Sequence, residues 1–196
     1  MPPKAKFLRE EIVSAALAIV RTEGFDALTA RSLGAKLESS ARPIFTVFRN
    51  MEDVQHAVMD AAKMLYKEYI KKGLSQEQAF KGVGIQYILF SIQEPKLFQL
   101  LFMSEHHEVP DLSHVLPLID DNYDRILFSV QEYYGFDETN AKRLYHHLWI
   151  YTHGIATLCA TQMCRFTGLE ISAMITEVCK GLLKLMKEGS KNDSSQ

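Results

Sequence analysis

The sequence predicts an all-α protein of about nine helices. Apolar residues recur at helical spacing in most segments, and no segment alternates with period two over the length of a strand. Glycine or proline separates many of the helical segments. We expect a small three-helix domain at residues 1–50, a larger helical domain at 51–188 and a disordered tail at 189–196.

The first helix is predicted from about residue 8 to residue 23. Its apolar residues form one stripe that includes Ile12, Ile19 and Val20, and Gly24 supplies a C-terminal stop. A unit of about fifty residues is marginally stable alone, so we expect it to pack on helices from the rest of the chain.

Residues 29–48 are predicted to form two short helices joined by a tight turn. Thr29 is placed to cap the first helix and Ser40 the second, because a side-chain oxygen there accepts a backbone N–H. Ile44 and Phe48 lie one turn apart and are expected to face inward. The residues left pointing outward are Ala41, Arg42, Pro43 and Thr46. Helix-turn-helix proteins present such residues to base edges in the major groove.

The remaining helices are predicted at 51–73, 75–93, 95–103, 116–134, 137–167 and 169–187. Residues 104–115 are polar and irregular, so we expect the longest loop there. Gly82 and Gly84 lie inside a predicted helix, where each costs about 1 kcal/mol relative to alanine, which suggests close packing against another backbone. The last two helices carry apolar residues on more than one face, which favours a homodimer through them.

Charge is unevenly distributed along the chain. Residues 1–50 carry eight Lys and Arg against five Asp and Glu, a net +3, which leaves −5 for residues 51–196 because the whole chain is −2. A basic front and an acidic rear fit a protein whose N-terminal part touches a polyanion. The start of the chain lacks a signal peptide and no apolar run approaches a membrane span, so we expect a cytoplasmic protein without membrane contact.

Cysteine and histidine patterns give no sign of a metal, cofactor or catalytic site. Cys159, Cys164 and Cys179 have no C-x-x-C spacing and are expected to be buried free thiols. Seven histidines are present, among them His106 and His107 beside Glu108, but none has the spacing of a known zinc motif. No Gly-rich phosphate loop or nucleophile elbow is found, so we do not expect an enzyme.

The stretch I-V-S-A-A-L-A-I-V…E-G-F-D-A-L-T-A-R-S-L-G-A-K-L…S-A-R-P-I-F-T-V-F-R-N-M-E-D-V resembles the DNA-binding region of TetR family transcriptional regulators. The rear half resembles the WHG-type group of TetR C-terminal domains in G-I-Q-Y-I-L-F…E-P-K-L-F-Q-L-L-F-M and in W-I-Y-T-H-G-I-A-T-L. The resemblance implies a homodimeric repressor that binds a near-palindromic double-stranded DNA operator. It also implies a helical domain in which a small, apolar or amphipathic effector sets the spacing of the two reading heads.

The resemblance and the residue pattern together nominate the DNA-binding residues, which are Thr29, Arg31, Ser40, Ala41, Arg42, Pro43, Phe45, Thr46 and Arg49. Positions 29, 45 and 51 would hold phosphates. Two departures weaken that expectation, because Phe45 stands where a tyrosine hydroxyl often meets a phosphate and Met51 replaces a lysine. Arg31, Arg42, Arg49 and the Lys4 and Lys6 arm are expected to compensate. Arg42 either reads guanine with its guanidinium, holds a phosphate or is simply solvated.

The nominated ligand-binding residues are Tyr87, Phe90, Phe98, Phe102, Met103, Tyr123, Trp149 and His153. Aromatic and Met side chains adapt to varied ligands, although at helical spacing most such residues form core. Two alternatives to a repressor stay open. One is a constitutive activator or architectural DNA-binding protein. The other is an all-α small-molecule-binding protein that has weakened or lost DNA binding.

Overall fold

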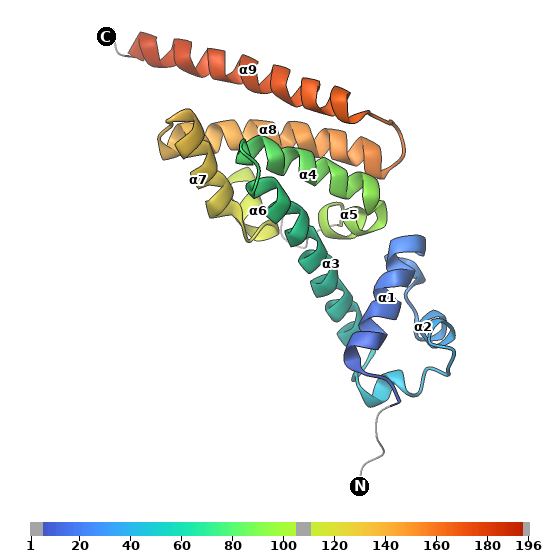
Figure 1. The fold of residues 1–196 in the computed structure, drawn as a ribbon. Coiled ribbons are helices and arrows are strands. Elements are labelled where there is room, and N and C mark those ends of the chain that lie inside the picture. The colour runs from blue at the N-terminus through green and yellow to red at the C-terminus, as the bar shows by residue number, and fades with distance from the viewer. Residues whose placement is uncertain (1–5, 105–110, 194–196) are drawn as a thin grey trace. The chain divides into compact units, whose positions relative to one another are not determined.

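The computed structural model describes residues 6–104 and 111–193, without the side chains of 113, 118, 119 and 189–193. These residues form nine α-helices and no strand, so the predicted all-α class is confirmed (Figure 1). The helices are α1 Arg9–Glu23, α2 Ala30–Lys36, α3 Met51–Leu74, α4 Ala79–Gln93, α5 Pro95–Phe102, α6 Leu112–Ile119, α7 Tyr123–Tyr134, α8 Glu138–Ala160 and α9 Gly168–Asp193. Two 3-10 turns, η1 Phe25–Ala27 and η2 Ile44–Thr46, complete the described elements.

The chain forms two compact units. The first consists of Met1–Lys67 and Glu94–Glu105, and the second of Glu68–Gln93 and His106–Gln196. Helix α3 is continuous across residue 67, so its N-terminal part belongs to the first unit and its C-terminal end to the second.

In the first unit, α1 packs against both α2 and α5. The buried stripe of α1 includes Ile12, Ile19 and Val20, as its apolar spacing predicts. At the end of α1, Arg21 forms a bidentate ion pair with Glu94, whose carboxylate is buried at the start of α5. One of the two bonds joins Arg21 Nε to Glu94 Oε2 at 2.7 Å. This pair fixes α5 against α1.

In the second unit, α4 packs most extensively on α8, and α7 and α9 flank them. The end of α3 meets the start of α4 through glycine backbone. A Cβ added to Gly73 would lie 2.6 Å from the Val83 Cα, and one added to Gly82 would overlap the Gly73 carbonyl oxygen. The predicted close backbone packing is therefore confirmed for Gly82. It is wrong for Gly84, where a Cβ would make an ordinary 3.5 Å contact with the Thr152 side chain.

The segment expected to be a loop at 104–115 is helical from Leu112. Residues 105–110 lie outside the described part, but α6 begins at Leu112, because the Asp111 carboxylate accepts the His114 backbone N–H at 3.2 Å and caps the helix. The single helix expected at 116–134 is divided at Asp120, whose carboxylate accepts the Asn122 N–H at 2.8 Å. At the C-terminus, α9 continues to Asp193, six residues past the expected end.

The cysteines are free, but the expectation that all three are buried is wrong. Cys164 is exposed because it lies in the segment between α8 and α9, and Cys159 and Cys179 are half-buried. Among the described residues, no three His, Cys, Asp or Glu side chains are arranged to hold a metal ion. His106, His107 and Glu108 lie outside them. None of the described helices combines the length and apolarity needed to cross a bilayer.

Candidate nucleic-acid interface

Helix α2 begins with the cap that the sequence predicts. Thr29 Oγ1 accepts the Ser32 backbone N–H at 3.1 Å, and Ser32 Oγ accepts the Thr29 N–H at 2.9 Å. These reciprocal bonds satisfy two backbone donors that a helix start leaves free. Thr29 and Arg31, both exposed, are thereby held at the first turn of a rigid element.

The chain leaves α2 through a tight turn that glycine and a strained residue make possible. The Ser39 N–H bonds to the Gly34 carbonyl at 2.9 Å and the Glu38 N–H to the Ala35 carbonyl at 3.0 Å, the paired bonds of a Schellman motif. A Cβ at Gly34 would lie 3.1 Å from the Ala41 backbone nitrogen, so the small residue lets the next segment approach. Glu38 has φ +50°, a left-handed conformation that favours glycine.

Replacing Glu38 with glycine is expected to stabilise the protein by about 0.5–1 kcal/mol. Relief of the left-handed strain outweighs the extra backbone entropy of glycine in the unfolded chain. Urea denaturation measures the change. Gln162→Gly is a matched variant, because Gln162 has φ +59° at the end of α8, and it should stabilise similarly. Destabilisation by both changes would contradict the strain argument.

The helix expected at 40–48 is instead a single 3-10 turn, Ile44–Thr46, which begins at Pro43 without a side-chain cap bond. The expected cap at Ser40 is therefore wrong. The Ile44 N–H bonds to the Ala41 carbonyl at 3.1 Å, so residues 41–44 form a turn, and Pro43 disfavours the helical conformation at the residue before it, which works against a longer helix. Buried Ile44 and Phe48 anchor the turn, and the Phe48 N–H bonds to the Ile44 carbonyl at 3.0 Å.

The turn presents a mixed surface of cation, aromatic ring and hydroxyl. Ser40, Arg42, Phe45 and Thr46 are exposed, and Ala41 and Pro43 are half-buried. The Phe45 side chain is 42% exposed, although an aromatic ring gains most when it is buried. The Thr46 hydroxyl donates to the Pro43 carbonyl at 2.7 Å, which leaves its oxygen free to accept.

Arg49, nominated for phosphate binding, is paired within the chain. Its Nε lies 2.9 Å from Asp53 Oδ2, and its backbone N–H donates to the same oxygen at 3.2 Å. Asn50 Oδ1 accepts the Asp53 N–H at 2.8 Å, so Asn50 and Asp53 together cap α3. The hydrogen bond from Arg49 lowers the pKa of Asp53. The i,i+4 spacing of Arg49 and Asp53 in the sequence indicates this pair.

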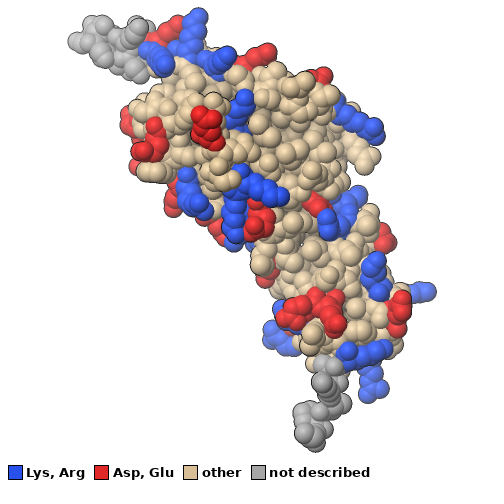
Figure 2. All heavy atoms as spheres, in the orientation of Figure 1, with Lys and Arg blue, Asp and Glu red and all other residues tan. Residues whose placement is uncertain are grey.

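Basic residues from the start of the chain lie beside the same turn. Lys6 Nζ donates to Ser39 Oγ at 2.9 Å, and the Arg9 guanidinium lies 4.3 Å from the Phe48 ring centroid. Lys4 is outside the described residues. On the first unit, Lys and Arg side chains are interspersed with acidic groups (Figure 2). The described member of the expected compensating arm, Lys6, therefore reaches the turn.

The nominated ligand-binding residues are divided between the two units. Phe98, Phe102 and Met103 belong to the first unit, where the Phe98 and Phe102 ring centroids are 5.1 Å apart. Tyr87, Phe90, Tyr123, Trp149 and His153 belong to the second. Phe90 and Phe98 are fully buried, and Met103 is exposed.

Within the second unit, Tyr87, Trp149 and His153 come together. Tyr87 Oη is hydrogen-bonded to His153 Nδ1 at 2.9 Å, and the His153 ring stacks on Trp149 with centroids 5.0 Å apart. Burial lowers the pKa of His153. Burial also raises the pKa of Tyr87, and the negative charge of Asp120 raises it further by a smaller amount. The predicted half-buried position of His153 beside Trp149 is confirmed.

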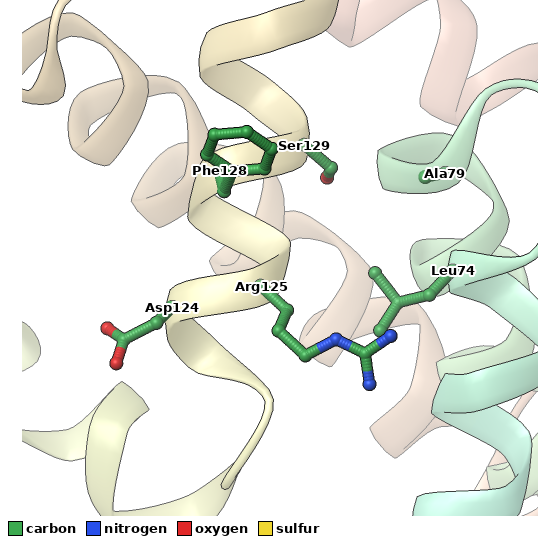
Figure 3. Close-up of a pocket in the computed structure, with 6 residues that line it drawn as sticks. All are labelled: Leu74, Ala79, Asp124, Arg125, Phe128 and Ser129. Atoms are coloured by element: carbon green, nitrogen blue, oxygen red, sulfur yellow. The ribbon is translucent and has the colours of Figure 1, made fainter.

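A depression of about 370 Å³ lies elsewhere in the second unit (Figure 3). It is lined by Leu74 at the end of α3, Ala79 at the start of α4, and Asp124, Arg125, Phe128 and Ser129 on α7. None of the nominated ligand-binding residues lines it. The sequence does not single out the α7 residues, because an Arg and a Phe three residues apart are common on a solvated helix face.

Comparison with known proteins does not assign a family to the chain. Neither protein-family models nor curated protein sequences match the chain.

Proposed function

We propose that the protein is a homodimeric DNA-binding transcriptional regulator, of the TetR type that its sequence resembles, and most simply a repressor released by a small molecule. The observation that carries the proposal is the turn at residues 40–48. Buried Ile44 and Phe48 hold Arg42, Phe45 and Thr46 outward on a short segment that follows the capped helix α2. A rigid turn that exposes a guanidinium and hydroxyl oxygens suits contact with base edges and phosphates.

Helix α3 supplies a route from the second unit to this turn. Its first turn is capped by Asn50, directly after the segment that carries Arg42 and Thr46, and its last residue lies in the second unit. A small molecule that binds one conformation of the second unit better than another would shift the equilibrium by the difference in its affinities. Such a shift at the end of α3 would change the spacing of two reading turns in a dimer.

The proposed dimer would use α8 and α9, where apolar side chains are unusually accessible. Ile150 on α8 and Leu169 and Leu185 on α9 are 52%, 85% and 63% exposed. Large exposed apolar patches mark interaction surfaces. Light scattering coupled to gel filtration should give twice the mass of the chain, and a monomeric mass would count against the dimer.

The decisive experiment is binding of the purified protein to the duplex DNA that precedes its own coding region, titrated at two salt concentrations beside an unrelated duplex. Saturable binding to a near-palindrome, with half-sites one or more helical turns apart, is expected to weaken steeply with salt. Equal weak binding to both duplexes would count against a regulator that reads sequence.

Arg42→Ala is expected to lose about 1–3 kcal/mol of binding free energy at one base position if Arg42 reads guanine. The guanidinium would otherwise bond to O6 and N7 together, and alanine offers neither donor. Affinities for operators substituted at each position measure the effect. The matched control is Arg31→Ala on the exposed start of α2, for which we expect uniform weakening. Uniform weakening by Arg42→Ala would assign Arg42 to a phosphate instead.

The second candidate is a small-molecule-binding protein that has weakened or lost DNA binding. Three observations favour it: Arg49 is paired with Asp53, Phe45 lacks a hydroxyl, and half-buried Met51 supplies no charge at the first position of α3.

Met51→Lys separates the two candidates. We expect the added cation to tighten binding to the operator severalfold and to steepen its salt dependence, because one more phosphate is neutralised. Fluorescence anisotropy at several salt concentrations measures both, and Met64→Lys, at an exposed position further along α3, is the control. No DNA binding by either the parent chain or Met51→Lys would favour the second candidate.

A further inference from the structure

The depression between α7 and the junction of α3 and α4 combines an apolar wall with a cation. Leu74, Ala79 and Phe128 supply the apolar surface, and the Phe128 side chain is 60% exposed. In Figure 3 the Arg125 side chain extends from α7 toward Leu74, whereas Asp124 points away from it. The depression has a volume of about 370 Å³ and is open to solvent, so it would cover one side of a small molecule.

Arg125 has no hydrogen-bond or ion-pair partner within the described residues. Its guanidinium keeps five donors in a fixed fork, a shape that matches a carboxylate. Ser129 donates its hydroxyl proton to the Ile126 carbonyl at 2.7 Å, so it adds only an acceptor to the wall. The cation is therefore the main polar determinant of what this depression can bind.

We propose that the depression binds an amphipathic organic anion, with a carboxylate on Arg125 and an acyl chain against Leu74 and Phe128. The chain of such a ligand would cover the exposed Phe128 ring and gain the free energy of apolar burial. The head group would gain a charge-assisted bidentate contact that an amine or alcohol of equal length lacks.

The site adjoins the backbone junction of α3 and α4. Leu74 directly follows Gly73, whose backbone is in contact with that of Gly82 and Val83. Backbone atoms in contact cannot make room by side-chain rotation. A ligand bound between Leu74 and α7 would therefore shift the end of α3 itself. This step rests on the proposed function, and it makes the anion the effector of the regulator.

Calorimetric titration of the full chain with decanoate, decylamine and decan-1-ol, each below the concentration at which it aggregates, tests the site without DNA. We expect decanoate to bind saturably and at least about fivefold tighter than decylamine. Arg125→Gln should weaken decanoate at least about fivefold and leave decan-1-ol unchanged, a factor that matches one partly exposed ion pair. Phe128→Ala should weaken decanoate and decan-1-ol alike.

The matched control is Arg143→Gln, an exposed arginine on α8 that is not part of the depression, and it should leave all three affinities unchanged. Circular dichroism establishes that each variant is folded. The proposal is overturned if decanoate does not bind, if decylamine binds equally well, or if folded Arg125→Gln binds decanoate like the parent chain. It is also overturned if Phe128→Ala abolishes the dimer and no ligand binds, since the surface is then a contact between copies.

The effector role is measured separately, by operator binding with and without decanoate in the parent chain and in Arg125→Gln. Weaker operator binding that depends on Arg125 supports it. Unchanged operator binding with decanoate bound overturns the effector role and leaves the regulator intact. Failure to bind any duplex overturns the proposed function, while the calorimetric result still decides whether the site exists.

Discussion

Replacing Gly82 with alanine is expected to lower the free energy of unfolding by about 2 kcal/mol. The new Cβ would overlap the Gly73 carbonyl oxygen, so the ends of α3 and α4 must separate, and backbone atoms have no rotamer by which to give way. Overpacking of this kind typically costs 1–3 kcal/mol, and here it exceeds the roughly 1 kcal/mol that alanine gains in a helix. Urea denaturation followed by circular dichroism measures the loss.

Gly84→Ala is the matched control for Gly82→Ala, two residues along the same helix. A Cβ at position 84 would make ordinary contacts, 3.5 Å to Thr152 Cγ2 and 3.9 Å to Ile175 Cδ1. This variant should be neutral or more stable by up to about 1 kcal/mol, because only the helix propensity changes. Equal losses for the two variants would refute the close approach of α3 and α4.

The all-α class and the inward face of most helices follow from apolar periodicity, which is a local property of the sequence. The helix boundaries are predicted less accurately by this periodicity. The expected count of about nine agrees with the described helices because two errors cancel: 40–48 forms a turn, and 116–134 is divided into α6 and α7. The Asp120 carboxylate follows α6 and accepts the Asn122 backbone N–H, a bond that the apolar stripe does not predict.

The end of α8 was hard to predict because the residue at its left-handed position, Gln162, is not a glycine. Helix α8 ends at Ala160, well before Gly168 where the sequence places its end. Backbone hydrogen bonds close the turn, from the Met163 N–H to the Leu158 carbonyl and from the Gln162 N–H to the Cys159 carbonyl, each at 3.0 Å, and the sequence around Gln162 carries no glycine to announce them.

Part of the candidate site can be predicted from the sequence, because that part depends on local helical spacing. The exposure of Arg42 and Thr46 follows from the one-turn spacing of Ile44 and Phe48, which the sequence displays. The contact of Lys6 with Ser39 joins residues 33 apart, and the depression at Arg125 joins residues of α3, α4 and α7. Such long-range contacts depend on how helices pack, so helical periodicity alone does not reveal them.

Arg21→Ala is expected to lower the free energy of unfolding of the first unit by about 2–3 kcal/mol. This is a large effect for a side chain that is 48% exposed. The cost arises at its partner, because the Glu94 carboxylate is only 8% exposed and would be left without its hydrogen-bonding cation. Arg21→Lys should recover part of the loss, since an ammonium restores the charge but not the fork of two donors. Thermal and urea denaturation measure each variant.

Two further variants establish whether the cost belongs to burial of the carboxylate. Lys142→Ala removes a cation from an exposed pair with Glu138 on α8 and should change stability by less than about 0.5 kcal/mol. The double variant Arg21→Met with Glu94→Leu removes both charges and should lie within about 1 kcal/mol of the parent chain, because apolar groups need no partner. If the double variant were instead less stable than Arg21→Ala alone, the ion pair itself, and not the stranded carboxylate, would supply the stability that joins α1 to α5.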